Sequence, residues 1–414
     1  MIVCPTSLIY NWMDEFENFA PKLKCVVVTG MPEEREKAIK SGKAQVIITS
    51  YPLIRRDIEL YKNINFDTVF IDEAQNIKNA ASQNAQSVKQ LRCAHRFALT
   101  GTPIENSLSE LWSIFDFVMP GYLMSHSKFV DTYEKYIVSA NKDQEIADQA
   151  MKNLGKRIHP FIMRRMKKEV LTELPDKVEE KKLCELSDDQ KKVYLAYMSD
   201  LKNEINANVK ENGFEKSRLK ILAALTRLRQ ICCHPATFID NYKGDSGKLD
   251  MLMELLPDCI SNGHRVLVFS QFTSMLAIIE KKLKEAGYSY FILQGDTPVD
   301  VRHEYVDRFN KGEGQVFLVS LKAGGTGLNL VGADTVIHYD PWWNPAVEDQ
   351  ATDRVYRIGQ DRNVHVMKII TRGTIEEKIF KLQARKKELS DNVITSGEVF
   401  ISKLSQADIE EIFS

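Results

Sequence analysis

Residues 1–120 alternate short apolar runs with amphipathic stretches. The runs are rich in β-branched side chains and end in turn or polar residues, which is typical of buried parallel strands. The stretches between them have helical periodicity, for example Leu8–Phe19 and Ala81–Leu91. This alternation predicts an α/β sheet with helices on both faces. The predicted strands are MIVCP, CVVVTG, AQVIITSY, DTVFIDE and HRFALTGTP.

The pattern changes near residue 123 and changes back near residue 264. Between these points the chain is charged and helix-periodic, and Ser187–Glu211 and Lys216–Cys232 are predicted to be helices exposed on one face. The segment RRMKKEVLTELPDKVEEKK before them is predicted to be a linker, broken at Leu174-Pro175. A second α/β lobe is predicted from the strand-like runs HRVLVFSQ, YSYFILQG, GQVFLVS, DTVIHYD and HVMKIIT, and a charged terminal helix from Thr374–Asn392.

These changes divide the chain into five predicted segments. They are a first lobe at 1–122, a helical protrusion and linker at 123–183, a helical insertion of the second lobe at 184–262, a second lobe at 263–373, and a C-terminal helix and tail at 374–414. A length of 414 residues agrees with two to three domains, and 43% apolar residues suffice for more than one core.

Composition narrows the classes of function only slightly. The formal net charge of -1 gives no support to nucleic-acid binding, although a local basic surface suffices for it. No apolar run is long enough to predict a membrane span, and the N-terminus lacks the charged region of a signal peptide. Seven scattered cysteines favour reduced thiols in an intracellular protein, and Cys232-Cys233-His234 is poorly spaced for zinc.

Two adjacent acids, Asp72 and Glu73, follow the predicted strand Thr68–Ile71. Open α/β sheets bind ligands at the carboxyl ends of their strands. Because successive residues point in different directions, one acid can hold Mg²⁺ while the other orients an attacking water, and phosphoryl transfer needs both roles. Taken alone, the pair also fits a strand followed by a helix-capping Asp.

Asn344-Pro345 predicts the start of a helix and Gly359 its end. Gln350, Arg354 and Arg357 are spaced four and three residues apart, so they are predicted to share one face of that helix. Two arginines on one face can stabilise charge on a γ-phosphoryl group in the transition state. A solvated basic face is the alternative.

Three further segments hold candidate chemistry. KAGGTG follows the strand VFLVS, and its glycines let the backbone approach a phosphate closely, although a tight strand-to-helix turn explains them as well. Thr100-Gly101-Thr102-Pro103 ends a strand at the same sheet edge as Asp72. Trp342-Trp343 lies between a strand and the arginine helix, where buried packing is the default.

The order of these features along two α/β lobes is hard to reach by chance. With them, the sequence resembles the Swi/Snf family of helicase superfamily two over essentially its whole length. The matching segments are CPTSLIYNW, VIITSY, DEAQ, LTGTPIENSLSELWSIFDFVMPG, RLRQICCHP, SGKL, RVLVFSQF, LQGDT and SLKAGGTGLNLVGADTVIHYDPWWNPAVEDQATDRVYRIGQ, of which the last is highly specific.

The resemblance implies a double RecA-like motor that hydrolyses ATP with Mg²⁺ between its lobes, tracks along double-stranded DNA and remodels protein–DNA complexes. DNA-bound proteins are further partners that it suggests, and no membrane is implied. The resemblance also implies a place of action, which is the nucleoid in the cytoplasm if the protein is bacterial and the nucleus if it is eukaryotic. Asp72 is implied as the Mg²⁺-associated acid, Glu73 as the water-orienting base, and Arg354 and Arg357 as transition-state arginines, with Arg357 the arginine finger.

Other roles are implied only by position in the matching motifs. The residues implied for the nucleotide or for coupling are Gln75, Thr100, Gly101, Thr102, Gly325, Gly327 and Gln350. Those implied for DNA contact are Pro5, Thr6, Ser7, Ser50, Tyr51, Ser270, Gln271, Lys322, Gly324, Thr326 and Trp343.

The sequence departs from the family at two points. Gln75 stands where the family more often has His, although Gln can also donate and accept hydrogen bonds. In the family a G-x-G-K-T loop and an adenine-reading segment precede CPTSL, and neither occurs in this sequence. The chain is therefore expected to be a fragment whose first lobe is incomplete and which hydrolyses little ATP by itself.

Two other functions remain open. A strand-separating helicase acting on RNA or DNA is disfavoured by the SGKL and CCHP segments and by the long helical insertion. A non-catalytic, DNA-binding regulatory chain agrees with the missing loop, but not with the retained acids Asp72 and Glu73 and arginines Arg354 and Arg357.

Overall fold

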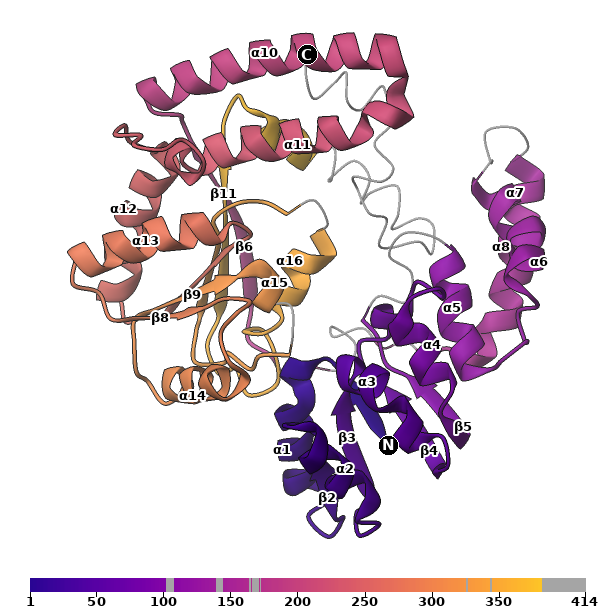
Figure 1. Cartoon of the computed structure of the whole chain (residues 1–414). Helices are drawn as coiled ribbons and strands as arrows, with labels where there is room; N and C mark the ends of the chain where they lie inside the picture. Colours follow the sequence, from indigo (N-terminus) through magenta and orange to yellow (C-terminus); the bar gives the residue numbers. More distant parts are fainter. Residues whose placement is uncertain are drawn as a thin grey trace. The chain divides into compact units, whose positions relative to one another are not determined.

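The computed structural model describes residues 1–101, 108–138, 144–163, 165, 171, 173–324, 327–342 and 345–381 (Figure 1). Its contacts divide the chain into two units, of which the first takes in residues 1–170 and the second begins at Leu171. Each unit has its own parallel β-sheet and its own hydrophobic clusters.

The first sheet contains all five strands that the apolar runs predict, in the order β2-β3-β1-β4-β5 with every neighbouring pair parallel. Its strands are β1 (Ile2–Cys4), β2 (Cys25–Val27), β3 (Val46–Ser50), β4 (Asn65–Ile71) and β5 (Arg92–Ala98). The helices between and after them are α1 (Ile9–Phe19), α2 (Pro32–Lys40), α3 (Tyr51–Tyr61), α4 (Gln83–Lys89) and α5 (Leu108–Val118).

Alternate residues of the central strand β1 serve two cores. Val3 packs with α3, α4 and α5 on one face of the sheet, whereas Ile2 and Cys4 pack with α1 on the other. The prediction of helices on both faces is therefore confirmed. After α5, the helical segments α6 (His126–Phe129), α7 (Lys135–Val138) and α8 (Gln144–Ile158), with a π-helical stretch at Val130–Glu134, pack on a separate cluster.

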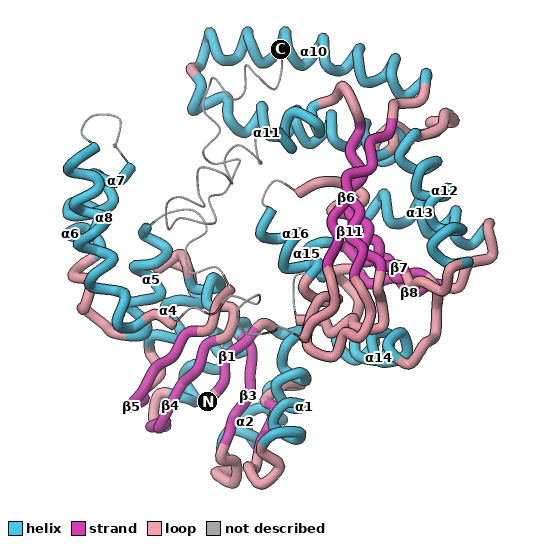
Figure 2. Tube along the Cα trace, turned by 180° about the vertical axis from the view of Figure 1, so that it is seen from behind, coloured by secondary structure: helices cyan, strands magenta, loops and turns pink. Residues whose placement is uncertain are grey.

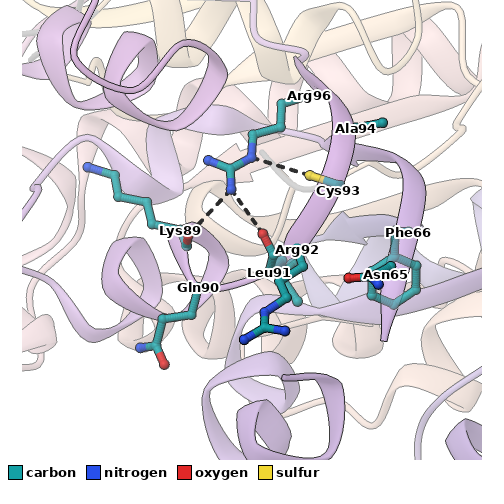
Figure 3. Close-up of a pocket in the computed structure, with 9 residues that line it drawn as sticks. All are labelled: Asn65, Phe66, Lys89, Gln90, Leu91, Arg92, Cys93, Ala94 and Arg96. Carbon is teal, nitrogen blue, oxygen red and sulfur yellow. Dashed lines mark hydrogen bonds between the residues drawn. The ribbon is translucent and has the colours of Figure 1, made fainter. Parts of the chain in front are cut away.

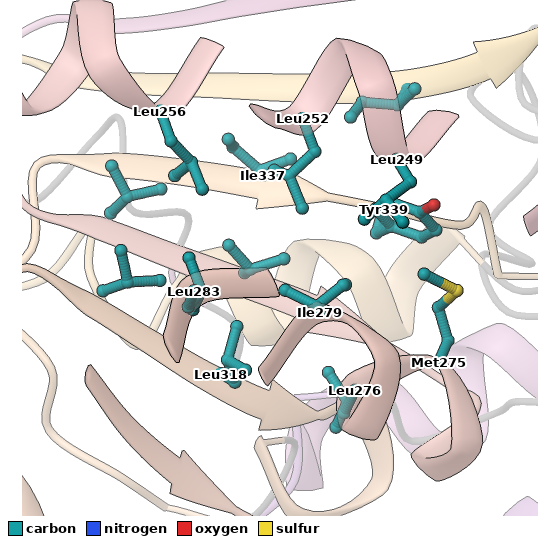
Figure 4. Packing of buried hydrophobic residues seen from close by; sticks show 14 of the residues in the cluster. Leu249, Leu252, Leu256, Met275, Leu276, Ile279, Leu283, Leu318, Ile337 and Tyr339 are labelled. Atoms are coloured by element: carbon teal, nitrogen blue, oxygen red, sulfur yellow. The ribbon is translucent and has the colours of Figure 1, made fainter. Parts of the chain in front are cut away.

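The second sheet is six-stranded and fully parallel, in the order β6-β11-β10-β7-β9-β8. Its strands are β6 (Lys177–Cys184), β7 (Val266–Ser270), β8 (Tyr290–Leu293), β9 (Val316–Ser320), β10 (Thr335–His338) and β11 (Val364–Thr371). Helices α12 (Gly247–Ser261) and α13 (Thr273–Glu285) cover one face, where Leu252 and Ile279 meet Ile337 and Leu318 (Figure 4). Helices α14 (Val299–Asn310), α15 (Leu321–Gly324) and α16 (Pro345–Thr352) pack on the other face.

The predicted linker before the helical insertion is wrong over its last part. Residues Lys177–Cys184 form β6, which lies beside β11 and pairs with it in parallel along all eight residues (Figure 2). The strand is mostly exposed and carries short runs of Lys and Glu. It therefore lacks the alternating or continuous apolar pattern from which a strand is predicted. Charged side chains suit the edge of a sheet, because they discourage pairing with other chains.

The helical insertion is a pair of long helices, α10 (Asp188–Asn212) and α11 (Phe214–Cys233), close to the predicted bounds (Figure 1). Gly213 joins them with a φ of 78°, a left-handed conformation that favours glycine. Ile375 and Ile379 of the C-terminal helical stretch 375–381 pack into the cluster between the two helices. The rest of the predicted helix Thr374–Asn392 lies outside the described residues.

None of the helices in the described ranges has both the length and the apolar character that a lipid bilayer requires of a span.

Candidate active site

The two predicted acids lie at the carboxyl edge of the first sheet. β4 ends at Ile71, and its continuation stays tied to both neighbouring strands, because Asp72 N donates to Val3 O at 2.8 Å and Leu99 N donates to Ile71 O at 2.8 Å. The next turn is closed by Ala74 N, which donates to Leu99 O at 2.9 Å. The acids and the segment that begins at Thr100 are thus held on adjacent strand ends.

The carboxylate of Asp72 is held at both oxygens. Its Oδ1 accepts the backbone N–H of Glu73 at 2.8 Å, and its Oδ2 accepts the indole Nε1–H of Trp12 at 3.0 Å. The hydroxyl of Tyr51 donates to the main-chain oxygen of Asp72 at 2.7 Å. Each carboxylate oxygen can accept about two hydrogen bonds, so both keep capacity for a further ligand.

This geometry fits Mg²⁺ held by one carboxylate. Mg²⁺ prefers oxygen ligands and is usually bound through one or two carboxylates, with water and substrate phosphates completing its shell. Among the described residues there is no cluster of three or more His, Cys, Asp or Glu side chains that could hold a metal ion. Asp72 offers one carboxylate, which suits a cation whose other ligands are water and phosphate oxygens.

Glu73 has a left-handed backbone, with φ 49° and ψ 57°. Such a conformation costs a non-glycine residue about 1–3 kcal/mol and persists only where surrounding contacts impose it. Here the amide of Gln75 donates to Glu73 Oε2 at 2.6 Å, and the Thr100 hydroxyl donates to Gln75 Oε1 at 3.0 Å. Gln75 thus donates and accepts at once, and it links the acid to the strand end that carries Thr100.

The predicted DNA contacts of the first unit divide by burial. Thr6 is exposed, and Pro5 and Ser7 are half-buried. Ser50 and Tyr51 are 0% and 1% exposed, and the expectation that their segment lies along DNA stays a prediction. Burial raises the pKa of Tyr51, and its hydroxyl donates to the main-chain oxygen of Asp72.

Ser270 and Gln271 of the second unit are also held internally. The hydroxyl of Ser270, which is buried, donates to Asp340 Oδ1 at 2.5 Å, and the backbone N–H of Gln271 reaches Asp340 Oδ2 at 3.2 Å. The Gln271 side chain accepts from Arg229 Nη1 at 3.1 Å. The Ser270 side chain is buried and that of Gln271 is half-buried, and their contact with DNA stays a prediction.

Arg229 and Asp340 form a buried contact that no motif or spacing predicts. Arg229 is 1% exposed, lies 3.8 Å from Asp340 Oδ2 and donates to the carbonyl of Pro341. Burial raises the pKa of Asp340, and the charge of Arg229 opposes that rise. The only hint in the sequence was that Arg229 lies in RLRQICCHP and Asp340 in HYDPWWN, two segments used for the family resemblance.

The SGKL segment is structural rather than phosphate-binding. The Ser246 hydroxyl donates to Cys233 O at 2.6 Å, and a Cβ on Gly247 would lie 1.9 Å from Glu185 O. Lys248 Nζ donates to Tyr339 O at 2.9 Å and pairs with Glu376 Oε2 at 2.7 Å, both side chains being fully buried. Each residue of Ser-Gly-Lys therefore meets a steric or electrostatic need of the second unit.

The segment with Arg354 and Arg357, predicted to be one helix from Asn344-Pro345 to Gly359, is only partly helical; we call it the arginine segment. α16 begins at Pro345 as expected but ends at Thr352, and the half-buried Arg354 and Arg357 lie in the turns that follow it. The buried side chain of Gln360 donates to Val331 O and Ala333 O at 3.2 and 2.8 Å, which holds these turns against the preceding loop. The single helical face predicted for Gln350, Arg354 and Arg357 is therefore wrong.

The remaining candidates lie in or beside short gaps in the description. Lys322 and Gly324 belong to α15, and Gly327 follows with a φ of 66°. Gly101 is exposed directly after Thr100. Thr102, Gly325, Thr326 and Trp343 lie outside the described residues.

A surface pocket of the first unit lies away from the acids, beside the beginning of β5 (Figure 3). Arg96 points across it and donates to Leu91 O at 2.9 Å, Lys89 O at 3.5 Å and Cys93 Sγ at 3.3 Å. The guanidinium is thus engaged in holding the α4–β5 connection, and the pocket is separate from the candidate active site.

Two family models together match most of the chain, and the first extends past Leu171 into the second unit. Residues 1–237 match the family described as SNF2-related domain, and residues 247–359 match the helicase conserved C-terminal domain. The chain is 40% identical over 424 residues to the putative ATP-dependent helicase/translocase YwqA of Bacillus subtilis, an alignment that covers 100% of this chain and 45% of that protein. With the TATA-binding protein-associated factor MOT1 of Saccharomyces cerevisiae it shares 33% identity over 465 residues, covering 100% of this chain and 25% of MOT1.

A solved structure has a similar fold. The Sulfolobus solfataricus SWI2/SNF2 ATPase core in complex with dsDNA aligns with a TM-score of 0.50 and 37% identity, covering 99% of this chain and 85% of that one. The chain spans less than half the length of the curated relatives named above.

Proposed function

The chain belongs to the SNF2-related family, and we propose on that basis that it forms the motor portion of an ATP-dependent double-stranded-DNA translocase that remodels protein–DNA complexes. The observation that carries this proposal is the hydrogen-bonded array of Asp72, Glu73, Gln75 and Thr100 on adjacent strand ends. A structural strand end needs neither two acids nor a left-handed Glu73.

The proposed chemistry assigns one task to each side chain. Asp72 is fixed in orientation and holds Mg²⁺, which neutralises phosphate charge when it is bound with ATP. Glu73 orients the attacking water, and Gln75 fixes the direction of its carboxylate. Arg354 and Arg357 stabilise the charge that develops on the γ-phosphoryl group, with Arg357 as the arginine finger.

Double-stranded DNA is the proposed track, and DNA-bound proteins are the proposed targets. The solved relative was determined with dsDNA, and one curated relative is named as a factor associated with the TATA-binding protein. Thr6, exposed at the carboxyl end of β1, remains a candidate contact to the DNA backbone.

Phosphate release by the full-length protein, measured with and without duplex DNA, tests the motor. Glu73→Gln is expected to abolish turnover and to leave nucleotide affinity largely intact, because the change removes a charge needed for the water and not for ground-state binding. Turnover at the wild-type rate in this variant contradicts the assignment.

Two further assays separate the alternatives. Displacement of a DNA triplex without separation of the duplex strands supports translocation, whereas strand displacement supports a helicase. Absence of turnover in the full-length protein supports a non-catalytic DNA-binding chain. The expectation that the 414-residue chain by itself releases little phosphate stays a prediction, and the same assay on that chain tests it.

A further inference from the structure

Trp12 contacts the proposed catalytic acid from a different part of the chain. It lies on α1, 60 residues before Asp72, and its indole Nε1 is 3.0 Å from Asp72 Oδ2. The ring packs beside the cluster of Ile2, Cys4 and Ile48, on the face of the first sheet that α1 covers. The apolar body of the side chain is thus anchored, while its one polar group reaches the carboxylate.

The contact completes a three-point support of Asp72. Glu73 N holds Oδ1, Trp12 Nε1 holds Oδ2, and the Tyr51 hydroxyl holds the main-chain oxygen. Rotation of the carboxylate would break a hydrogen bond to a charged acceptor, which is stronger than one between neutral groups. The indole has a donor and no acceptor, so Asp72 Oδ2 is the acceptor in this contact.

We propose that Trp12 is a positioning residue for Asp72, which keeps the carboxylate aimed at the Mg²⁺ of the bound nucleotide and places a fluorescent ring beside that ion. This inference rests on the proposed function. Outer-shell partners of metal ligands typically contribute about 10–100-fold to metal affinity or activity, because they fix ligand orientation. A tryptophan that only fills the core makes no such contribution.

Trp12→Phe removes the donor and keeps an aromatic ring. In the full-length protein it is expected to raise the Mg²⁺ concentration for half-maximal phosphate release by about tenfold, the lower end of the outer-shell range. Trp112→Phe is the matched control, because Trp112 Nε1 donates to Met124 O at 3.1 Å in the same unit and takes no part in the acid array. The control is expected to keep the wild-type Mg²⁺ requirement.

A second measurement does not depend on turnover. Mn²⁺ is paramagnetic and quenches a nearby indole, so Mn²⁺ added with ADP is expected to quench part of the intrinsic fluorescence. That part should vanish in Trp12→Phe and in Asp72→Asn, and it should persist in Trp112→Phe. Because Asp72→Asn leaves Trp12 in place, this comparison still decides the matter if Trp12→Phe does not fold.

The outcomes for the inference and for the motor are distinguishable. Wild-type Mg²⁺ dependence in Trp12→Phe, or equal quenching in wild type and Asp72→Asn, overturns the role of Trp12 while the motor stands. Lower thermal stability in Trp12→Phe with an unchanged Mg²⁺ requirement shows packing only and overturns it as well. Absence of hydrolysis in the wild type refutes the motor, and the quenching comparison then still tests Trp12 by itself.

Discussion

Removing one partner of the Lys248–Glu376 pair is expected to destabilise the second unit strongly. Lys248 Nζ lies 2.8 and 2.7 Å from the two oxygens of Glu376, and both side chains are 0% exposed. Lys248→Met removes the cation and leaves the carboxylate buried with the N–H of Thr371, which donates to it at 3.0 Å. Breaking a buried pair in this way costs about 3–5 kcal/mol, because the remaining charge loses its counter-ion without regaining water.

The expected change in melting temperature follows from the size of the unit. A change of 1 kcal/mol shifts Tm by about 2–4 °C in a domain of 150–250 residues, so Lys248→Met should lower Tm by roughly 6–20 °C. The effect should not vary between neutral and mildly alkaline pH. Burial lowers the pKa of Lys248, but the charge and hydrogen bond of Glu376, together with the neighbouring Cys233 and Cys184, outweigh burial and the pKa is raised. The stabilisation is therefore fully present below the unfolded lysine pKa of about 10.4 and is lost only above the raised folded value.

Calorimetric melting of four variants makes the reasoning refutable. Lys282→Met is the matched control, because Lys282 pairs with Glu285 at 3.2 Å while both side chains are about half exposed, and such pairs contribute about 0–1 kcal/mol. Glu376→Gln should resemble Lys248→Met, and the two changes together should cost less than the sum of the single changes, since no buried charge remains. The reasoning fails if Lys248→Met melts like Lys282→Met, or if the double variant is as unstable as that sum.

Three further predictions concern the arginine segment, DNA binding and pH. Arg357→Ala should reduce DNA-stimulated turnover by roughly 10³-fold or more with little change in Tm, and Arg357→Lys should be nearly as damaging because lysine lacks the planar fork; restored turnover in the lysine variant argues against an arginine finger. Duplex-DNA affinity should fall linearly on a log–log plot against salt, with about 0.9 counterions released per phosphate neutralised, and an affinity indifferent to salt contradicts the proposed DNA contacts. Burial lowers the pKa of His338 to about 4, so the unfolded state takes up its proton first and stability should decrease as pH falls from about 6.5 toward 4, by at most about 3 kcal/mol. His338→Gln should flatten that part of the stability profile, and an unchanged profile would show that another group is responsible.

The strands could be predicted where complete burial makes them continuous apolar runs in the sequence. β7 and β9 are buried along their whole length, so VLVFS and VFLVS are continuous apolar runs. β6 is held by backbone pairing with β11 on one side and is otherwise mostly exposed. Its pattern of charges therefore resembles a linker, and only the position of its partner strand distinguishes the two.

The candidate site was predictable as far as parallel strands bring their carboxyl ends together. That rule placed Asp72 and Thr100 at one edge, and in the structure Gln75 connects Thr100 to Glu73, the residue after Asp72. It could not identify Trp12 or Tyr51 as partners of Asp72, because these contacts depend on how α1 and α3 pack. The sequence also could not indicate that Ser50 and Ser270 are buried, since a small polar side chain fits both a core and a surface.

The prediction that Gln350, Arg354 and Arg357 share one helical face was wrong for a related reason. Spacing of four and three residues predicts one helical face only while the helix continues. The amide of Leu330 donates to the carbonyl of Arg354 at 2.9 Å, and the side chain of Gln360 binds three carbonyls of the neighbouring loop and turn. These tertiary hydrogen bonds replace helical ones after Thr352, and no local propensity could indicate them.

Helices α11 and α12 hold the chain just before the turns that contain Arg354 and Arg357. Three successive residues after β10 are held from outside the strand: Lys248 of α12 binds the carbonyl of Tyr339, and Arg229 of α11 contacts the Asp340 carboxylate and the Pro341 carbonyl. The following residue, Trp342, is tied to α16 by its N–H, which donates to Glu348 Oε1 at 2.6 Å. Because a shift of these carbonyls would cost buried hydrogen bonds to cations, α11 and α12 help to fix the chain from which α16 and the turns with Arg354 and Arg357 continue. RLRQICCHP and SGKL, distant in sequence from the arginines, therefore act on the same structural element as the arginines themselves.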